Sequence, residues 1–178
     1  WGIDATPTVV VDLSGRTQVA TVPVSAPPYP SPAIPPNFGL IPMFPLVRAI
    51  VPAKDAPQGH PGQSFVQTAQ RRWGEANLAS LEDPSKLASE PEKGDVAGPV
   101  SIAVATAVPA AAPAKPDATP ASNPPEPDQG PKPETRVAAI GDSDFAANAY
   151  LGIEGNRDLF MNTVNWLSQQ EGLIAIRP

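Results

Sequence analysis

Proline placement constrains this chain more than any other feature of its sequence. Proline lacks the backbone N–H that helices and sheets use, so segments dense in proline rarely form either. The 178 residues include 26 prolines, of which nine lie between Pro23 and Pro45 and nine more between Pro109 and Pro133. Regular secondary structure is therefore expected outside these two stretches. The length suits one ordinary domain, so we expect residues 1–178 to belong to a single domain.

The second of these stretches is predicted to be a disordered insertion. Residues 107–134 contain nine prolines and seven alanines, interspersed with charges of both signs. A segment with so few large apolar side chains cannot bury enough surface to offset the entropy that it would lose on ordering. We therefore expect a Pro/Ala-rich insertion between two neighbouring strands of one sheet.

Charge and composition exclude several function classes. The formal net charge is −6, and residues 1–106, 107–134 and 135–178 each contribute −2. A protein that holds nucleic acid through its phosphates needs clustered Lys and Arg, so nucleic-acid binding is disfavoured. The chain has no cysteine, which removes thiolate metal sites and disulfides. It also has no glycine-rich phosphate loop, and no cofactor is predicted.

Apolar runs bounded by turn residues predict the strands. The clearest of these runs are TVVVDL, PVSIAVAT and RVAAIG, which are rich in β-branched residues and alanine. Such runs are typical of buried strands. Five strands are expected, at Thr8–Leu13, Leu46–Val51, Pro99–Thr106, Arg136–Gly141 and Leu173–Ile176.

Two helices are predicted near the C-terminus. The first is expected directly after Gly141, where Asp and Ser residues suit a helix cap, and the second is expected to start at Asn156. Within the second helix, Phe160, Val164 and Leu167 fall at helical spacing and are expected to face a sheet. Strands that alternate with helices predict an α/β fold with a mostly parallel sheet.

The most specific sequence words lie between Arg136 and Pro178. They are GDSDF, GNRDLF, NWL and IAIRP, in that order. In order and spacing they resemble the end of the gliding-motility-associated ABC transporter auxiliary component, the GldG-like family. Weaker matches to the same family occur earlier in the chain, for example FPLVRAI and GPVSIAVA.

This resemblance implies a flavodoxin-like or class I glutamine-amidotransferase-like fold, incomplete at its N-terminus. It also implies a periplasmic position on the extracytoplasmic face of the bacterial inner membrane, with ABC permease and ATPase subunits as partners. A transmembrane helix is expected to follow Pro178 and to anchor the domain. Amidotransferase chemistry is not expected, because that scaffold uses a cysteine nucleophile and the chain has no cysteine.

The segment Asp142, Ser143 and Asp144 is the first candidate site. Its GDS word is similar to the nucleophile motif of an esterase family, whose Ser needs an Asp and a His to remove its proton. The sole histidine, His60, lies upstream in a Gly- and Pro-rich loop. The two Asp side chains could instead ligate a hard cation, but the sequence fixes no further oxygen ligands and no metal is predicted. A turn that caps the following helix is the preferred interpretation.

The residues Asn156, Arg157 and Asp158 are the second candidate site, at the start of the second helix. An arginine is mildly unfavourable at the positive end of a helix dipole, so Arg157 is expected to pair with Asp142 or Asp144. An internal bridge of this kind is preferred over ligand binding.

The leading hypothesis is a noncatalytic auxiliary domain, for binding or assembly, of an ABC-type transport system related to gliding motility. One alternative is a serine hydrolase that uses Ser143. The other is a Pro-rich interaction scaffold that presents residues 107–134 to partners. Trp73 and Trp166 are expected to lie in the core under each of these hypotheses.

Overall fold

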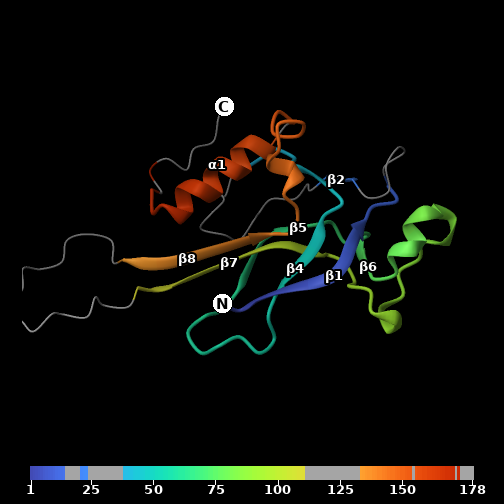
Figure 1. Cartoon of the computed structure of the whole chain (residues 1–178), viewed down its shortest axis with the longest axis horizontal. Helices are drawn as coiled ribbons and strands as arrows, with labels where there is room; N and C mark the ends of the chain where they lie inside the picture. Colours follow the sequence, from blue (N-terminus) through green and yellow to red (C-terminus); the bar gives the residue numbers. More distant parts are fainter. Residues whose placement is uncertain (15–20, 24–37, 111–132, 154, 171, 173–178) are drawn as a thin grey trace, which may run out of the picture.

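The computed structural model describes residues 1–14, 21–23, 38–110, 133–153, 155–170 and 172 (Figure 1). Short 3-10 helices and one α-helix accompany the strands. The helices are η1 (Leu78–Glu82), η2 (Pro84–Lys86), η3 (Pro91–Lys93), η4 (Asp144–Ala146) and α1 (Asn156–Leu167). The strands are β1 (Ile3–Val11), β2 (Thr21–Pro23), β3 (Met43–Pro45), β4 (Arg48–Pro52), β5 (Gln63–Gln67), β6 (Trp73–Glu75), β7 (Ser101–Pro109) and β8 (Glu134–Ile140).

The described strands form antiparallel sheets. One three-stranded sheet has the order β4-β1-β6, a second has the order β5-β7-β8, and β2 pairs with β3. The expected α/β fold with a mostly parallel, flavodoxin-like sheet is therefore wrong.

The physical reason lies in the connections between strands. Parallel neighbours need a crossover of a dozen or more residues, usually a helix. Here β7 and β8 pair directly, from Ala103 opposite Ile140 to Pro109 opposite Glu134. The helix expected after Gly141 is only the three-residue η4, and α1 follows the last described strand. Neither helix can therefore serve as a crossover between described strands, and the strand expected at Leu173–Ile176 lies outside the described residues.

Four of the predicted strands are confirmed as strands. They correspond to β1, β4, β7 and β8, with bounds shifted by a few residues. Local β-branched runs were sufficient to find them. The sequence did not predict β5 and β6, which lie in a polar segment where isolated residues such as Phe65 and Trp73 are buried.

One apolar core joins the two three-stranded sheets, β3, η4 and α1. The sheets contribute Val10, Phe65 and Ile102, which are at most 1% exposed. Phe44 of β3 packs against Phe145 of η4, with ring centroids 5.1 Å apart. This packing fixes the turn after β8 against the strands that precede β4 in the chain.

Helix α1 buries a different stripe from the one predicted. Leu159 and Trp166 are buried at 0% and 2% exposure, whereas Phe160, Val164 and Leu167 are 37–39% exposed. The two stripes are offset by one residue, about 100° around the helix. The observed orientation places the guanidinium of Arg136 5.1 Å from the centre of the Trp166 ring. Burial of Trp73 and Trp166 confirms that both belong to the core.

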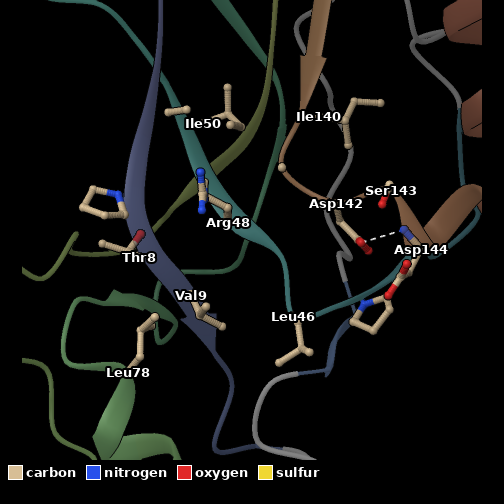
Figure 2. Close-up of a pocket in the computed structure, with 14 residues that line it drawn as sticks. Thr8, Val9, Leu46, Arg48, Ile50, Leu78, Ile140, Asp142, Ser143 and Asp144 are labelled. Atoms are coloured by element: carbon tan, nitrogen blue, oxygen red, sulfur yellow. Dashed lines mark hydrogen bonds between the residues drawn. The ribbon is translucent and has the colours of Figure 1, made fainter.

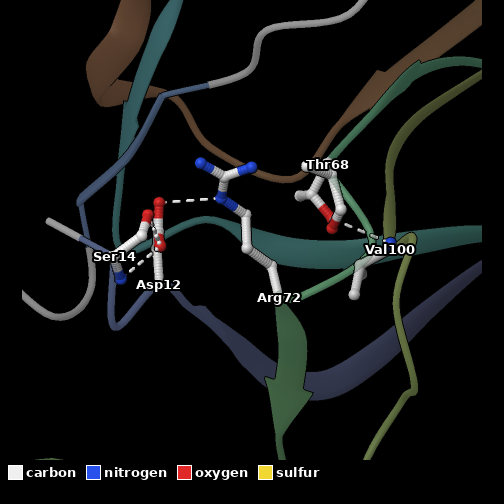
Figure 3. A network of polar contacts seen from close by, with 6 residues as sticks. Asp12, Ser14, Thr68, Arg72 and Val100 are labelled. Atoms are coloured by element: carbon white, nitrogen blue, oxygen red, sulfur yellow. Dashed lines mark hydrogen bonds and ion pairs between the residues drawn. The ribbon is translucent and has the colours of Figure 1, made fainter.

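A buried ion pair fixes the β1–β6 edge (Figure 3). Arg72 Nε donates to Asp12 Oδ2 at 2.7 Å, and the two side chains are only 11% and 3% exposed. The other carboxylate oxygen of Asp12 accepts hydrogen bonds from the backbone and hydroxyl of Ser14. Beside this pair, Thr68 and Val100 exchange two bonds of 2.9 Å, which connect the residues flanking β5 and β7. Each group thus ties together two strands of its own sheet: the Asp12–Arg72 pair acts at β1 and β6, and the Thr68–Val100 pair at β5 and β7.

The ends of the insertion meet at the far end of the β7–β8 ladder. Ala110 N donates to Pro133 O at 2.9 Å. The predicted bounds of the disordered insertion, 107–134, are too wide, because residues 107–109 and Glu134 are paired in the ladder. Residues 111–132 lie outside the described part, so their predicted disorder stays a prediction. Within the described residues, no helix is both long enough and apolar enough to cross a bilayer.

Candidate ligand pocket

A pocket of about 480 Å³ lies where β1, β4 and the end of β8 meet (Figure 2). This volume falls within the range of about 300–1,000 Å³ that is typical of small-molecule sites. Its wall mixes aliphatic side chains with charged and hydroxyl groups. The lining residues are Ala5, Pro7, Thr8, Val9, Pro45, Leu46, Arg48, Ile50, Leu78, Ile140, Gly141, Asp142, Ser143 and Asp144.

Gly141 holds the end of β8 against β4. Its N donates to Ile102 O, and its O accepts from Arg48 N, both at 2.9 Å. A Cβ at this glycine would lie 1.9 Å from Arg48 O, so no larger residue fits without moving the backbone. This close approach sets the position from which the next three residues enter the pocket.

Asp142 combines a hydrogen-bonded oxygen with an unsatisfied one. Its Oδ1 accepts from Asp144 N at 2.8 Å, which is the local bond of an Asx turn. Its Oδ2 is buried and has no hydrogen-bond partner among the described residues. Burial, reinforced by the negative charge of Asp144, raises the pKa of Asp142 above its ordinary value. The carboxyl group therefore favours either protonation or a donor brought by a ligand.

Ser143 is exposed in the same turn, without the partners that a nucleophile needs. The hydroxyl of a catalytic serine requires a base within hydrogen-bond reach. The chain's one histidine, His60, packs edge-on against Trp1 at 5.0 Å between ring centroids and does not line the pocket. The arrangement does not supply the Ser–His pair of the hydrolase alternative.

Arg48 supplies the pocket's cation, and sequence reasoning missed it. It is the first residue of β4 and has an exposed side chain, with no ion pair to any residue that the structure describes. Figure 2 shows it on β4, between Thr8 of β1 and the turn that carries Asp142 and Asp144. The word FPLVRAI did contain one arginine in an apolar strand, but nothing local indicated its neighbours.

The second group of predicted site residues lies away from the pocket. Asn156 is fully buried, and its side chain accepts from Met43 N at 2.7 Å and donates to Met43 O and Tyr150 O at 3.0 Å. Arg157 is exposed and, among the described residues, forms no ion pair with Asp142 or Asp144. The predicted bridge between the two sites is therefore absent from this part of the chain. Asp158 is half-buried in the first turn of α1.

Two further expectations concern helix caps and metals. The second helix, α1, starts at Asn156 as predicted; Gly155 takes its N-cap position, and the helix ends at Leu167. In the described ranges, no three His, Cys, Asp or Glu side chains are grouped closely enough to share a metal ion. Among the described residues that line the pocket, the carboxylates are Asp142 and Asp144, one fewer than such a metal group would need.

Comparison with known proteins gives no relative for this chain. No family model, curated protein or solved structure matches it. Its function must therefore be inferred from the pocket and from the residues that build it.

Proposed function

We propose that this chain is a noncatalytic binding domain that serves as an auxiliary component of an ABC-type transport system. It acts on the extracytoplasmic, periplasmic face of the inner membrane and assembles there with permease and ATPase subunits. The C-terminal sequence motifs support this assignment, because they resemble motifs of the gliding-motility auxiliary family. The fold expected from that family is not the one observed, so the proposal depends on the motif and its position in the pocket.

The main observation behind this proposal is where the GDSDF motif lies in the fold. Its first four residues line the pocket, and Phe145 is buried at 3% exposure in the core. The GDSDF motif therefore forms one wall of the pocket, and its Phe145 anchors that wall in the core. Its polar residues Asp142, Ser143 and Asp144 line the open space, where a ligand can reach them.

A binding function agrees with the chemistry of this wall. Ser143 has no base beside it, while Asp142 and Asp144 face a pocket that also contains Arg48. Fixed charges of both signs around an open space suit recognition of a polar ligand. The same set lacks the nucleophile–base pair that acyl transfer would require.

Affinity purification tests the assembly part of the proposal. The full-length protein, tagged and expressed from its own locus, is extracted from crosslinked membranes and its companions are identified by mass spectrometry. An ATPase and a permease of the ABC type are expected with the wild type and with the control Arg157→Gln. Protease added to intact spheroplasts should digest the domain, because the proposed location is outside the cytoplasm.

Four results would count against this proposal. Recovery of the protein without ABC subunits would reject the assembly, and protection from protease in spheroplasts would reject the location. Ester hydrolysis that is abolished in Ser143→Ala would instead favour the hydrolase. Retention of all partners by the isolated peptide 107–134 would favour the Pro-rich scaffold.

A further inference from the structure

The pocket's charges indicate the class of ligand that it accepts. Its charged lining residues are Arg48 on β4 and, on the turn after β8, Asp142 and Asp144. None of the three is neutralised by an ion pair within the described residues. A purely anionic ligand would meet two carboxylates, and a purely cationic one would meet the guanidinium. A ligand with one negatively and one positively charged group can pair with both the guanidinium and a carboxylate.

The spacing between the charged walls is kept by the backbone. Arg48 N and Gly141 O are bonded at 2.9 Å, so the guanidinium and the carboxylates extend from neighbouring points of the fold. The Asx-turn bond from Asp144 N to Asp142 Oδ1 holds the turn in one shape. The strand that carries Arg48 and the turn that carries both Asp residues are thus held side by side, and no ion pair joins Arg48 to either Asp within the described residues.

The apolar part of the lining indicates what lies between the ligand's charged groups. Leu46 and Leu78 line the pocket and are 62% and 51% exposed, so both present apolar surface to it. Leu46 also has a φ of 51°, in a region that non-glycine residues rarely occupy. Backbone strain of this kind is often kept where a side chain serves binding. An aliphatic ligand group would cover both leucines.

We infer that the pocket binds a small zwitterion of the amino-acid or short-peptide class. The ligand carboxylate bonds the Arg48 guanidinium, its ammonium group bonds Asp144, and an aliphatic side chain packs against Leu46 and Leu78. Asp144 is the exposed carboxylate of the turn, whereas the Oδ2 of Asp142 is buried and out of the ligand's reach. This inference rests on the proposed function, because it names the ligand class of the same binding pocket.

Calorimetric titration with leucyl-leucine tests this inference on the full chain. Two analogues each lack one charge: N-acetyl-leucyl-leucine has no ammonium group, and leucyl-leucinamide has no carboxylate. A charge-assisted hydrogen bond corresponds to about tenfold or more in affinity, so both analogues should bind the wild type at least about tenfold more weakly. This comparison needs no substitution and cannot fail through misfolding.

Two variants assign each charge to its residue. Arg48→Gln should weaken binding of leucyl-leucine about tenfold or more but leave the carboxylate-free amide unaffected. Asp144→Asn should weaken leucyl-leucine similarly and leave the acetylated peptide unaffected. The controls Arg157→Gln and Glu92→Gln remove an exposed charge of the same sign outside the pocket and should change nothing.

The outcomes separate this inference from the proposed function. Equal affinity for all three peptides, or no heat with leucyl-leucine at about 1 mM, overturns the zwitterion site. Recovery of ABC subunits together with absent peptide binding rejects the ligand class alone. Peptide binding that depends on Arg48 and Asp144, without recovery of ABC subunits, rejects the transport assignment and keeps the site.

Discussion

Substituting Arg72 by methionine tests the buried ion pair at the β1–β6 edge. The change keeps most of the side-chain length and removes the charge, which leaves the Asp12 carboxylate 3% exposed and without its cation. Breaking a buried pair on one side costs about 3–5 kcal/mol. Because Arg72 keeps 11% exposure, we expect the lower end, about 3 kcal/mol of unfolding free energy at neutral pH.

The loss should depend on pH in a defined direction. Burial alone would raise the pKa of Asp12, but hydrogen bonds from Ser14 and Arg72 together with the Arg72 charge outweigh it and lower that pKa. A lowered carboxyl pKa means that the stabilisation is complete above the ordinary value of 3.8 and disappears as the pH falls through the folded-state value. The difference between wild type and Arg72→Met should therefore shrink in acid.

Urea unfolding followed by tryptophan fluorescence measures the effect, since Trp73 is buried next to Arg72 in the chain. Lys93→Met is the matched control, because the Lys93–Glu90 pair is 67% and 44% exposed and should contribute at most about 1 kcal/mol. The double variant Asp12→Asn, Arg72→Met should recover part of the loss. A cost of Arg72→Met below about 1 kcal/mol, or one that persists unchanged in acid, would refute the reasoning.

Three further predictions concern the pocket turn and α1. Asp142→Asn should raise the unfolding free energy at neutral pH, because a carboxyl group with a raised pKa destabilises the fold once it ionises. Urea titrations should show that this gain in unfolding free energy vanishes below about pH 3.8. Gly141→Ala should destabilise by at least about 1–3 kcal/mol through its clash with backbone, whereas Gly152→Ala, with open space around it, should not. By thermal unfolding, Leu159→Ala should cost about 2–5 kcal/mol and Leu167→Ala far less; equal losses would show that the buried stripe is misassigned.

The sequence predicted secondary-structure elements whose signal lies in a short run of residues. It failed to predict strand direction and the buried face of α1, which depend on residues distant in the chain. Runs such as SIAVAT are apolar and β-branched enough to identify β7 as a strand, but strand direction depends on which strands pair. The two stripes of α1 are both compatible with a helix. Contact of Trp166 with Arg136 and burial of Leu159 in the shared core decide between them, and neither contact is visible in the local pattern.

The candidate site was predicted in part for the same reason. Asp142, Ser143 and Asp144 were found because a polar turn after a strand is a local feature, and the structure places all three at the pocket. Arg48 was missed because its position depends on the bond between its backbone and Gly141, far away in the chain. Charged residues that are distant in the sequence and adjacent only in the folded protein show no regular spacing. A sequence pattern therefore does not reveal them.

The β7–β8 ladder also determines the order in which this part of the chain folds. Its two strands are joined through residues 110–133, and closing that loop costs about 1.5 kcal/mol more than closing one a sixth as long. Loop closure favours pairing first at the insertion end, where Val108 faces Thr135, because the pair at the opposite end, Ala103 with Ile140, encloses a longer stretch of chain. The ladder would then extend toward Gly141, which is bonded to Ile102. Refolding kinetics of Val108→Ala and Ile140→Val test this order: the first should slow folding, and the second should mainly speed unfolding.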